Sequence, residues 1–219
     1  APELSESERV REIAFVLNAR HGLRLVQRFG AKVSVELHTD CANDVDLTLA
    51  YAQRFHAICP DSFYVKIPFT PAGLIAARKL GQNGITVNMT LGFSARQNYL
   101  IARFANPAYV NVFIGRLNAF VADNELGDGV NVGEKATLAT QRELVRLRRI
   151  GAATSRLIGA SMRSAEQVAS LAGVDVFTMP TKVAAAFAEK PVTPTRQVDQ
   201  DPVVTTAAGV TLADFAGES

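Results

Sequence analysis

The chain has 219 residues, of which 48% are hydrophobic and 20% are charged, so it is long enough to bury a full hydrophobic core within one domain. Its 23 basic and 21 acidic residues leave a net charge of +2, and because no basic run or aromatic-interleaved patch stands out, nucleic acid is not an expected partner. No stretch of about 18 apolar residues predicts a membrane span. The two cysteines lack a metal-binding spacing and the first residues lack the features of a signal peptide, which together favour a reduced, cytoplasmic protein.

The first thirty residues are predicted to be helical. Ser5 and Glu8 have the spacing of a capping box at a helix start. Apolar residues then follow at helical spacing: Val10, Ile13 and Leu17. A second amphipathic stretch, over residues 23–29, ends at Gly30.

After Gly30, short β-rich runs alternate with helical stretches, which is typical of βα units around a parallel sheet. Six strands are predicted, over residues 33–37, 63–67, 86–91, 109–114, 156–160 and 174–179. A last short helix is predicted over 182–189. Beyond it the composition shifts to Pro, Thr, Gln and Asp, which indicates a tail or arm.

Most of the predicted strands have one apolar side and one side that carries polar groups near the carboxyl end. In the second strand, Phe63, Val65 and Ile67 alternate with Tyr64 and Lys66, and such neighbours point to opposite faces. An open sheet covered by helices on both faces has no place for a polar side. The interior mouth of a barrel does, so the pattern favours a catalytic α/β barrel.

Polar residues of several predicted strand ends are expected to converge in that mouth: Glu36, Lys66, Asn88, Thr90 and Ser161. Lys66 lies in an apolar run and is followed closely by a proline. A lysine in a dry site has a lowered pKa and becomes an amine nucleophile, which is the requirement for Schiff-base chemistry. Taken singly, each residue has an ordinary alternative: a snorkelling lysine, a glutamate in an ion pair, and polar residues that fill a barrel.

Five stretches of this sequence resemble the transaldolase family, within the class I (Schiff-base) aldolases: Val33-Ser34-Val35-Glu36, Val65-Lys66-Ile67-Pro68, Asn88-Met89-Thr90-Leu91, Phe113-Ile114-Gly115-Arg116 and Gly159-Ala160-Ser161-Met162-Arg163. Their order and spacing match as well, over roughly 32–189. The resemblance implies a (β/α)8 TIM-type barrel, of which six of the eight βα units are evident in this chain. The expected segments are an N-terminal helical segment (1–30), a barrel (31–190) and a C-terminal tail (191–219).

The resemblance also implies roles for single residues. Lys66 would be the Schiff-base lysine, and Glu36 and Thr90 would hold and activate a proton-shuttling water. The implied substrate-binding residues are Asn88 in the sugar site, Phe113, and the phosphate-binding Arg116, Ser161 and Arg163. Related fructose-6-phosphate aldolases have a tyrosine where Phe113 stands, which favours group transfer over simple cleavage. For the arginines, the alternative is a solvated charge at a strand end.

The activity that the resemblance implies is transfer of a dihydroxyacetone unit from a ketose phosphate to an aldose phosphate, in the pentose phosphate pathway of the cytoplasm. Sugar phosphates are the expected partners, and neither a metal nor an organic cofactor is expected. Two alternatives are simple class I cleavage of fructose 6-phosphate and a catalytically impaired relative that binds sugar phosphates.

The sequence departs from the family where the first two barrel strands should stand, with their catalytic aspartate and Thr-Asn-Pro-Ser motif. Either the chain is part of a longer protein, which we favour, or a partner chain completes the barrel, or the protein is an inactive relative. Because an open six-stranded barrel exposes two strand edges, we expect a homo-oligomer and not a free-standing monomer.

Overall fold

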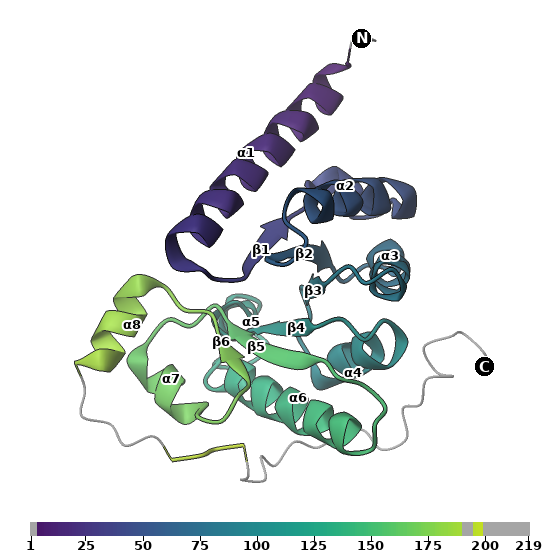
Figure 1. Cartoon of the computed structure of the whole chain (residues 1–219). Coiled ribbons are helices and arrows are strands. Elements are labelled where there is room, and N and C mark those ends of the chain that lie inside the picture. Colours follow the sequence, from purple (N-terminus) through teal and green to yellow (C-terminus); the bar gives the residue numbers. More distant parts are fainter. Residues whose placement is uncertain (1–3, 190–194, 199–219) are drawn as a thin grey trace. The chain divides into compact units, whose positions relative to one another are not determined.

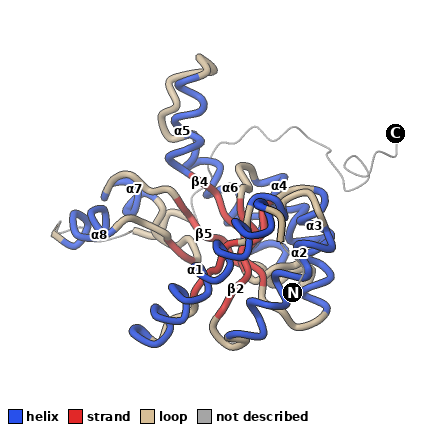
Figure 2. The backbone as a smooth tube through the Cα atoms, turned by 90° about the horizontal axis from the view of Figure 1, so that it is seen from above, coloured by secondary structure: helices blue, strands red, loops and turns tan. Residues whose placement is uncertain are grey.

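The computed structural model describes residues 4–189 and 195–198, in which strands and helices alternate along the chain (Figures 1 and 2). These residues form two compact units. The first comprises 4–92, 101–111 and 153–155, and the second comprises 93–100, 112–152, 156–189 and 195–198. No described helix combines the length and the apolar character needed to cross a membrane.

The first unit contains β1 (Val33–Glu36), β2 (Phe63–Pro68), β3 (Val87–Thr90) and the first three residues of β4 (Tyr109–Phe113). Each strand pairs in parallel with the one before it. A doubly wound sheet reverses its strand order, whereas sequential parallel strands are the arrangement of a βα barrel. Helices and a 3-10 turn connect and flank these strands: α1 (Glu6–Phe29), η1 (Thr39–Cys41), α2 (Val45–Ile58), α3 (Pro71–Gln82) and the end of α4 (Ala95–Phe104).

The core of the first unit is built on aromatic rings from three elements. Phe15 of α1 lies 4.5 Å from Phe55 of α2, measured between ring centres, and Phe55 lies 6.3 Å from Phe63 of β2. Gly22 allows α1 to approach this core, because a Cβ atom there would lie 2.9 Å from the Phe63 ring. One side of α1 is therefore fixed against the sheet through aromatic packing.

The second unit contains the end of β4, α5 (Ile114–Asp123), α6 (Val132–Arg149), β5 (Arg156–Ala160), α7 (Ala165–Ser170), β6 (Val176–Phe177) and α8 (Thr181–Ala188). Strands β5 and β6 are parallel, and α6 packs on both α5 and β5. Its core consists of fully buried aliphatic residues, among them Leu144, Leu147, Leu157 and Leu171. The backbone N–H of Gln197 donates to the carbonyl of Ala172 at 2.8 Å.

The predicted α/β fold with six parallel strands is confirmed, and it is that of a partial TIM-type barrel. The strand positions are correct, although β6 has only two residues instead of the expected six. The helix predicted before Gly30 is present, and its two amphipathic stretches belong to one continuous helix of 24 residues that begins after Ser5 and ends at Gly30. The tail expected over 191–219 lies outside the described residues except at 195–198.

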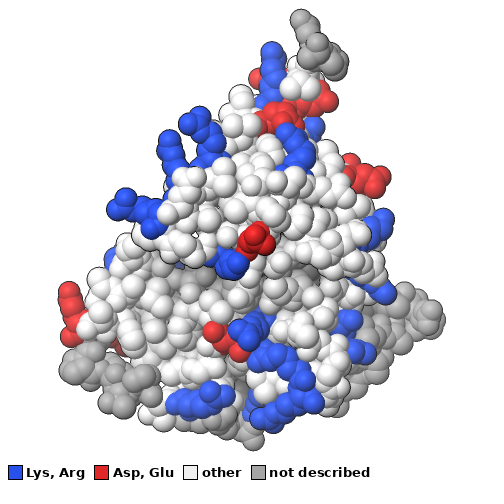
Figure 3. All heavy atoms as spheres, viewed as in Figure 1, with Lys and Arg blue, Asp and Glu red and all other residues white. Residues whose placement is uncertain are grey.

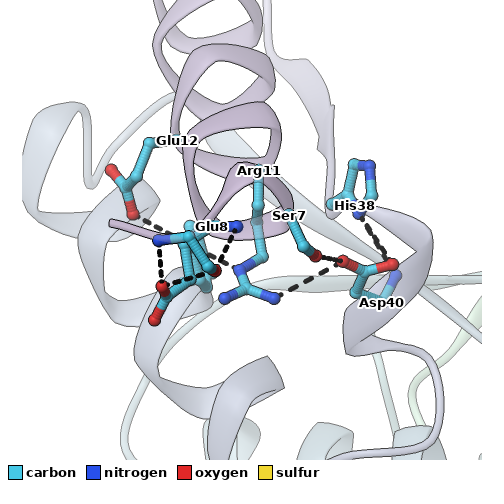
Figure 4. Close-up of polar contacts among 8 residues, drawn as sticks. Ser7, Glu8, Arg11, Glu12, His38 and Asp40 are labelled. Carbon is cyan, nitrogen blue, oxygen red and sulfur yellow. Dashed lines mark hydrogen bonds and ion pairs between the residues drawn. The ribbon is translucent and has the colours of Figure 1, made fainter. Parts of the chain in front are cut away.

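The N-terminal half of α1 is anchored by polar contacts (Figure 4). The predicted capping box of Ser5 and Glu8 is present. Glu12 accepts two hydrogen bonds of 2.6 Å from Arg54 of α2 and one of 2.5 Å from the Tyr51 hydroxyl. These donors, Arg54 foremost, lower the pKa of Glu12 to about 2.

A second contact in Figure 4 joins α1 to the turn that follows β1. Asp40 of η1 accepts hydrogen bonds from Ser7 at 3.1 Å and from Arg11 at 3.4 Å, and its other oxygen lies 3.4 Å from His38. Asp40 lies between the serine and the histidine, so the imidazole cannot accept the serine proton as it would in a nucleophilic triad. The cluster therefore positions α1 against η1.

The remaining side of α1 faces solvent in the described part of the chain. Its predicted apolar residues Val10, Ile13 and Leu17 are all exposed. The first turn is acidic and the last contains Arg28, which complements the helix dipole. Lys and Arg side chains project along α1 on the face shown in Figure 3.

Candidate active site

The first unit brings four of the predicted site residues onto neighbouring strands. Glu36 of β1 is in register with Lys66 of β2, and Lys66 is in register with Asn88 of β3. Residues in register in a parallel sheet share a face, and Thr90 shares it because it lies two residues after Asn88. The polar sides predicted for the first three strands therefore form one surface.

Lys66 and Glu36 are in direct contact. The ammonium Nζ of Lys66 forms an ion pair with Oε1 of Glu36. The Lys66 side chain is 21% exposed and that of Glu36 is 61% exposed, so the expectation of a dry, apolar lysine site is not met in the described residues. Lys66 instead has a carboxylate as its immediate neighbour, within reach of proton transfer.

Thr90 ends β3 in an unusual environment. Its side chain is buried, and Oγ1 has no hydrogen-bond partner among the described residues. A buried hydroxyl normally has a partner, so this oxygen can bind a group that enters the site. The next residue, Leu91, has a φ of 66°, and such backbone conformations in non-glycine residues are concentrated at functional sites.

Asn88 is held by a chain of side-chain hydrogen bonds. Its Nδ2 donates to Ser34 Oγ at 2.9 Å, and its Oδ1 accepts from Asn111 of β4 at 2.7 Å. Asn111 also donates to the carbonyl of Met89 at 2.8 Å. Asn111 was not among the predicted site residues, although its alternation with Val110 and Val112 placed it on the polar side of its strand.

The second unit contains the other four predicted residues: Phe113, Arg116, Ser161 and Arg163. The N–H of Gly115 donates to the carbonyl of Ser161 at 3.1 Å. A Cβ atom on Gly115 would lie 2.5 Å from that carbonyl oxygen and 2.6 Å from Nε of Arg163. This close approach joins the start of α5, which carries Arg116, to the segment that follows β5.

The same segment holds features suited to an anion. Ser161 has a φ of 61°, directly after the end of β5. Helix α5 begins without a side-chain cap. The N–H of Gly115 is already used by the Ser161 carbonyl, but the positive dipole end of the helix still favours a negative group nearby. The Arg116 guanidinium lies 5.3 Å from the centre of the Phe113 ring, an arrangement in which arginine keeps its donors for a ligand.

One buried carboxylate in the second unit was not predicted from the sequence. Glu134, in the first turn of α6, is 7% exposed and accepts hydrogen bonds from Asn118 and Gln167. Nothing in its spacing marks it, because a glutamate in the first turn of a helix is usually an exposed dipole partner. In the described part of the chain, no group of three or more His, Cys, Asp or Glu side chains is arranged to hold a metal ion.

Comparison with known proteins identifies the family of this chain. Residues 2–218 match the family model described as Transaldolase/Fructose-6-phosphate aldolase. A probable transaldolase of Thermus thermophilus is 35% identical over 191 residues, which are 86% of this chain and 76% of that protein. A transaldolase of Xanthomonas campestris pv. campestris is 32% identical over 177 residues, or 78% of this chain. This match covers 54% of the Xanthomonas protein, so the chain spans about half the length of that relative.

Proposed function

Because the chain belongs to the transaldolase and fructose-6-phosphate aldolase family, we propose that it transfers a dihydroxyacetone unit from a ketose phosphate to an aldose phosphate through a Schiff base on Lys66. The observation that carries this proposal is the contact between Lys66 and Glu36 on adjacent parallel strands. It supplies an amine together with a group that can accept its proton.

The proposed reaction begins when Glu36 takes a proton from the Lys66 ammonium. The neutral Nζ then attacks the C2 carbonyl of the ketose, and loss of water from the carbinolamine gives an iminium ion. Removal of the proton from the C4 hydroxyl breaks the bond between C3 and C4, releases an aldose phosphate and leaves an enamine on Lys66. The enamine adds to the acceptor aldehyde, and hydrolysis frees the product and the lysine. The iminium accepts the electron pair, so the proposed reaction needs neither metal nor organic cofactor.

Thr90 and Asn88 would assist these proton transfers. The unpartnered Thr90 hydroxyl can hold, together with Glu36, the water that carries protons to and from the substrate. Asn88 is fixed by Ser34 and Asn111, so it offers a preorganised amide for a sugar hydroxyl.

Arg116, Ser161 and Arg163 would bind the phosphate of the substrate. Guanidinium groups donate bidentate hydrogen bonds to phosphate oxygens, and phosphate is favoured at the uncapped start of a helix such as α5. A TIM-type barrel commonly binds phosphate in the segments after its late strands. We further propose that the substrates are those of the pentose phosphate pathway and that the protein acts in the cytoplasm as a homo-oligomer.

Borohydride trapping tests the proposal. The protein is incubated with fructose 6-phosphate and sodium borohydride, and the modified lysine is located by peptide mass spectrometry. We expect the adduct on Lys66, no adduct in Lys66→Arg, and an unchanged yield in Lys79→Arg, which alters an exposed lysine of α3. Turnover without modification of Lys66 would falsify the Schiff-base mechanism.

Two further assays on the same protein distinguish transfer from the two alternative functions, simple aldol cleavage and sugar-phosphate binding without turnover. Release of glyceraldehyde 3-phosphate from fructose 6-phosphate without any aldose acceptor would identify a simple aldolase. Binding of the sugar phosphate that survives Lys66→Ala, with no trapped adduct in the unchanged protein, would identify a binding protein without turnover.

A further inference from the structure

The buried carboxylate of Glu134, in the first turn of α6, connects that helix with α5 and α7 in the second unit. Its Oε2 accepts from Nδ2 of Asn118 in α5 at 3.0 Å, and its Oε1 accepts from Nε2 of Gln167 in α7 at 2.8 Å. Gln167 in turn accepts from the backbone N–H of Arg163 at 2.6 Å. A continuous path of hydrogen bonds therefore runs from the helix of Arg116 to the backbone of Arg163.

The two amides that contact Glu134 cannot exchange their oxygen and nitrogen atoms. Oδ1 of Asn118 accepts from the N–H of Gly133 at 2.6 Å, and Oε1 of Gln167 is occupied by Arg163. Both amides consequently direct N–H groups at residue 134. Only a side chain with two acceptors and no donor satisfies both, which is the property of a carboxylate.

The backbones at this junction are also in close contact. A Cβ atom on Gly133 would lie 2.5 Å from the carbonyl oxygen of Ile114, so α6 begins directly against the start of α5. Asn131, the residue before α6, gives no side-chain cap, and Asn118 supplies one from α5 instead. The Glu134 carboxylate accepts its hydrogen bonds from two neutral amides. Burial of a carboxylate is costly, and such a group is retained where its hydrogen bonds fix a geometry.

We propose that Glu134 is a positioning residue for substrate phosphate, which sets the spacing of Arg116 and Arg163 through Asn118 and Gln167. This inference rests on the proposed function, in which the two arginines bind the phosphate. Glu134 itself does not touch the substrate. Its effect appears in affinity for phosphate and not in the chemistry at Lys66.

The test exchanges the carboxylate at position 134 and the amide at position 167. Glu134→Gln places an N–H group against one of the two donors and breaks one hydrogen bond, whichever way the new amide turns. Gln167→Glu in the same chain restores every bond: the new carboxylate accepts from Arg163 and from the new amide at position 134, whose oxygen accepts from Asn118. Glu143→Gln is the matched control, because Glu143 lies on the same helix and pairs with Arg146, an exposed residue.

Two quantities are measured for each variant: the dissociation constant of inorganic phosphate by calorimetry, and kcat and KM with fructose 6-phosphate and an aldose phosphate acceptor. We expect Glu134→Gln to weaken phosphate binding and raise KM by about tenfold, as for one buried hydrogen bond, with kcat within about twofold. The double variant should return both to the level of the unchanged protein, and Glu143→Gln should change neither. The thermal unfolding temperature is measured for all variants. If Glu134→Gln lowers this temperature, the double variant should restore it.

The outcomes separate this inference from the proposed function. If Arg116→Ala weakens phosphate binding but Glu134→Gln does not, the positioning role is wrong and the phosphate site stands. The role is also wrong if Glu134→Gln lowers kcat alone, or if the double variant restores stability but not phosphate affinity. If the unchanged protein does not bind phosphate, the proposed phosphate site fails and this inference fails with it.

Discussion

At the scale of single residues, the contact between Lys66 and Glu36 concentrates the proposed chemistry in one pair of side chains. An amine that forms an imine must first lose a proton, and a carboxylate in contact with it is the simplest acceptor. The backbone of Glu36 is also held by α1, because the side chain of Asn18 donates to the Glu36 carbonyl at 3.1 Å. Lys66 and Glu36 are therefore already in contact, on adjacent strands, before any substrate binds.

Replacement of Glu36 tests this assignment. We expect Glu36→Gln to lower kcat by about 100-fold, since general acid–base groups typically contribute 10²–10⁴-fold, while Lys66 is still trapped by borohydride at a lower rate. Steady-state kinetics and trapping measure the two effects. Glu6→Gln, which removes an exposed carboxylate at the start of α1, should change neither, and an unchanged kcat in Glu36→Gln would remove Glu36 from the mechanism.

At the scale of elements, the junction of β4 and α5 depends on the absence of a side chain at Gly115. An alanine there would press its Cβ to 2.5 Å from the Ser161 carbonyl oxygen, and backbone cannot give way as a flexible side chain does. We expect Gly115→Ala to lower the free energy of unfolding by about 2 kcal/mol, the range for overpacking, and to weaken phosphate binding. Denaturant unfolding and calorimetry measure both quantities.

Gly81→Ala is the matched control for this substitution. Gly81 lies inside α3, and its Cβ would meet the Ala105 carbonyl oxygen at an ordinary 3.8 Å. Alanine should therefore stabilise the protein by about 0.5–1 kcal/mol through helix propensity. Equal effects of the two substitutions would contradict the close approach at Gly115.

The anchoring of α1 on α2 predicts a dependence of stability on pH. The pKa of Glu12 is lowered from 4.5 to about 2 by Arg54 and Tyr51, so the ionised form stabilises the folded state. This contribution is complete above the unfolded pKa and is lost as the pH falls from about 4.5 towards 2. We expect Glu12→Gln to cost about 1 kcal/mol at pH 7, a value reduced for the partial exposure of the pair, and almost nothing near pH 2. Denaturant unfolding at several pH values measures the difference, and a constant difference down to pH 2 would exclude this role.

At the scale of the whole molecule, sequence patterns predicted the strands and their polar faces better than they predicted single contacts between side chains. Short β-rich runs between helical stretches located the six strands. Alternation of polar and apolar residues located, in the first unit, the polar faces of β1, β2 and β3, because one period governs a whole strand. The two ends of α1 were also indicated, by the capping box at Ser5 and by Gly30, because helix ends carry local signals of their own. The sequence patterns missed Asn111 and Glu134, whose functions depend on partners that are distant in sequence: Asn88, Asn118 and Gln167.

The predicted site residues divide between the two units, and this division carries the last prediction. Lys66, Glu36 and Thr90 belong to the first unit, and Arg116 and Arg163 to the second. If the first group performs the chemistry and the second recognises phosphate, substitutions in the two groups should respond differently to a substrate that lacks phosphate.

The test compares fructose 6-phosphate with unphosphorylated dihydroxyacetone as donors, each with unphosphorylated glyceraldehyde as the acceptor at saturating concentration. Arg116→Ala should raise KM for fructose 6-phosphate by about 10–100-fold, as for the loss of a charge-assisted hydrogen-bonding group. It should leave KM for dihydroxyacetone within about twofold, because that donor has no phosphate to lose. Lys66→Arg should abolish turnover of both donors, since a guanidinium does not form an imine. An equal loss with both donors in Arg116→Ala would show that Arg116 acts on the reaction at Lys66 and not on the phosphate of the donor.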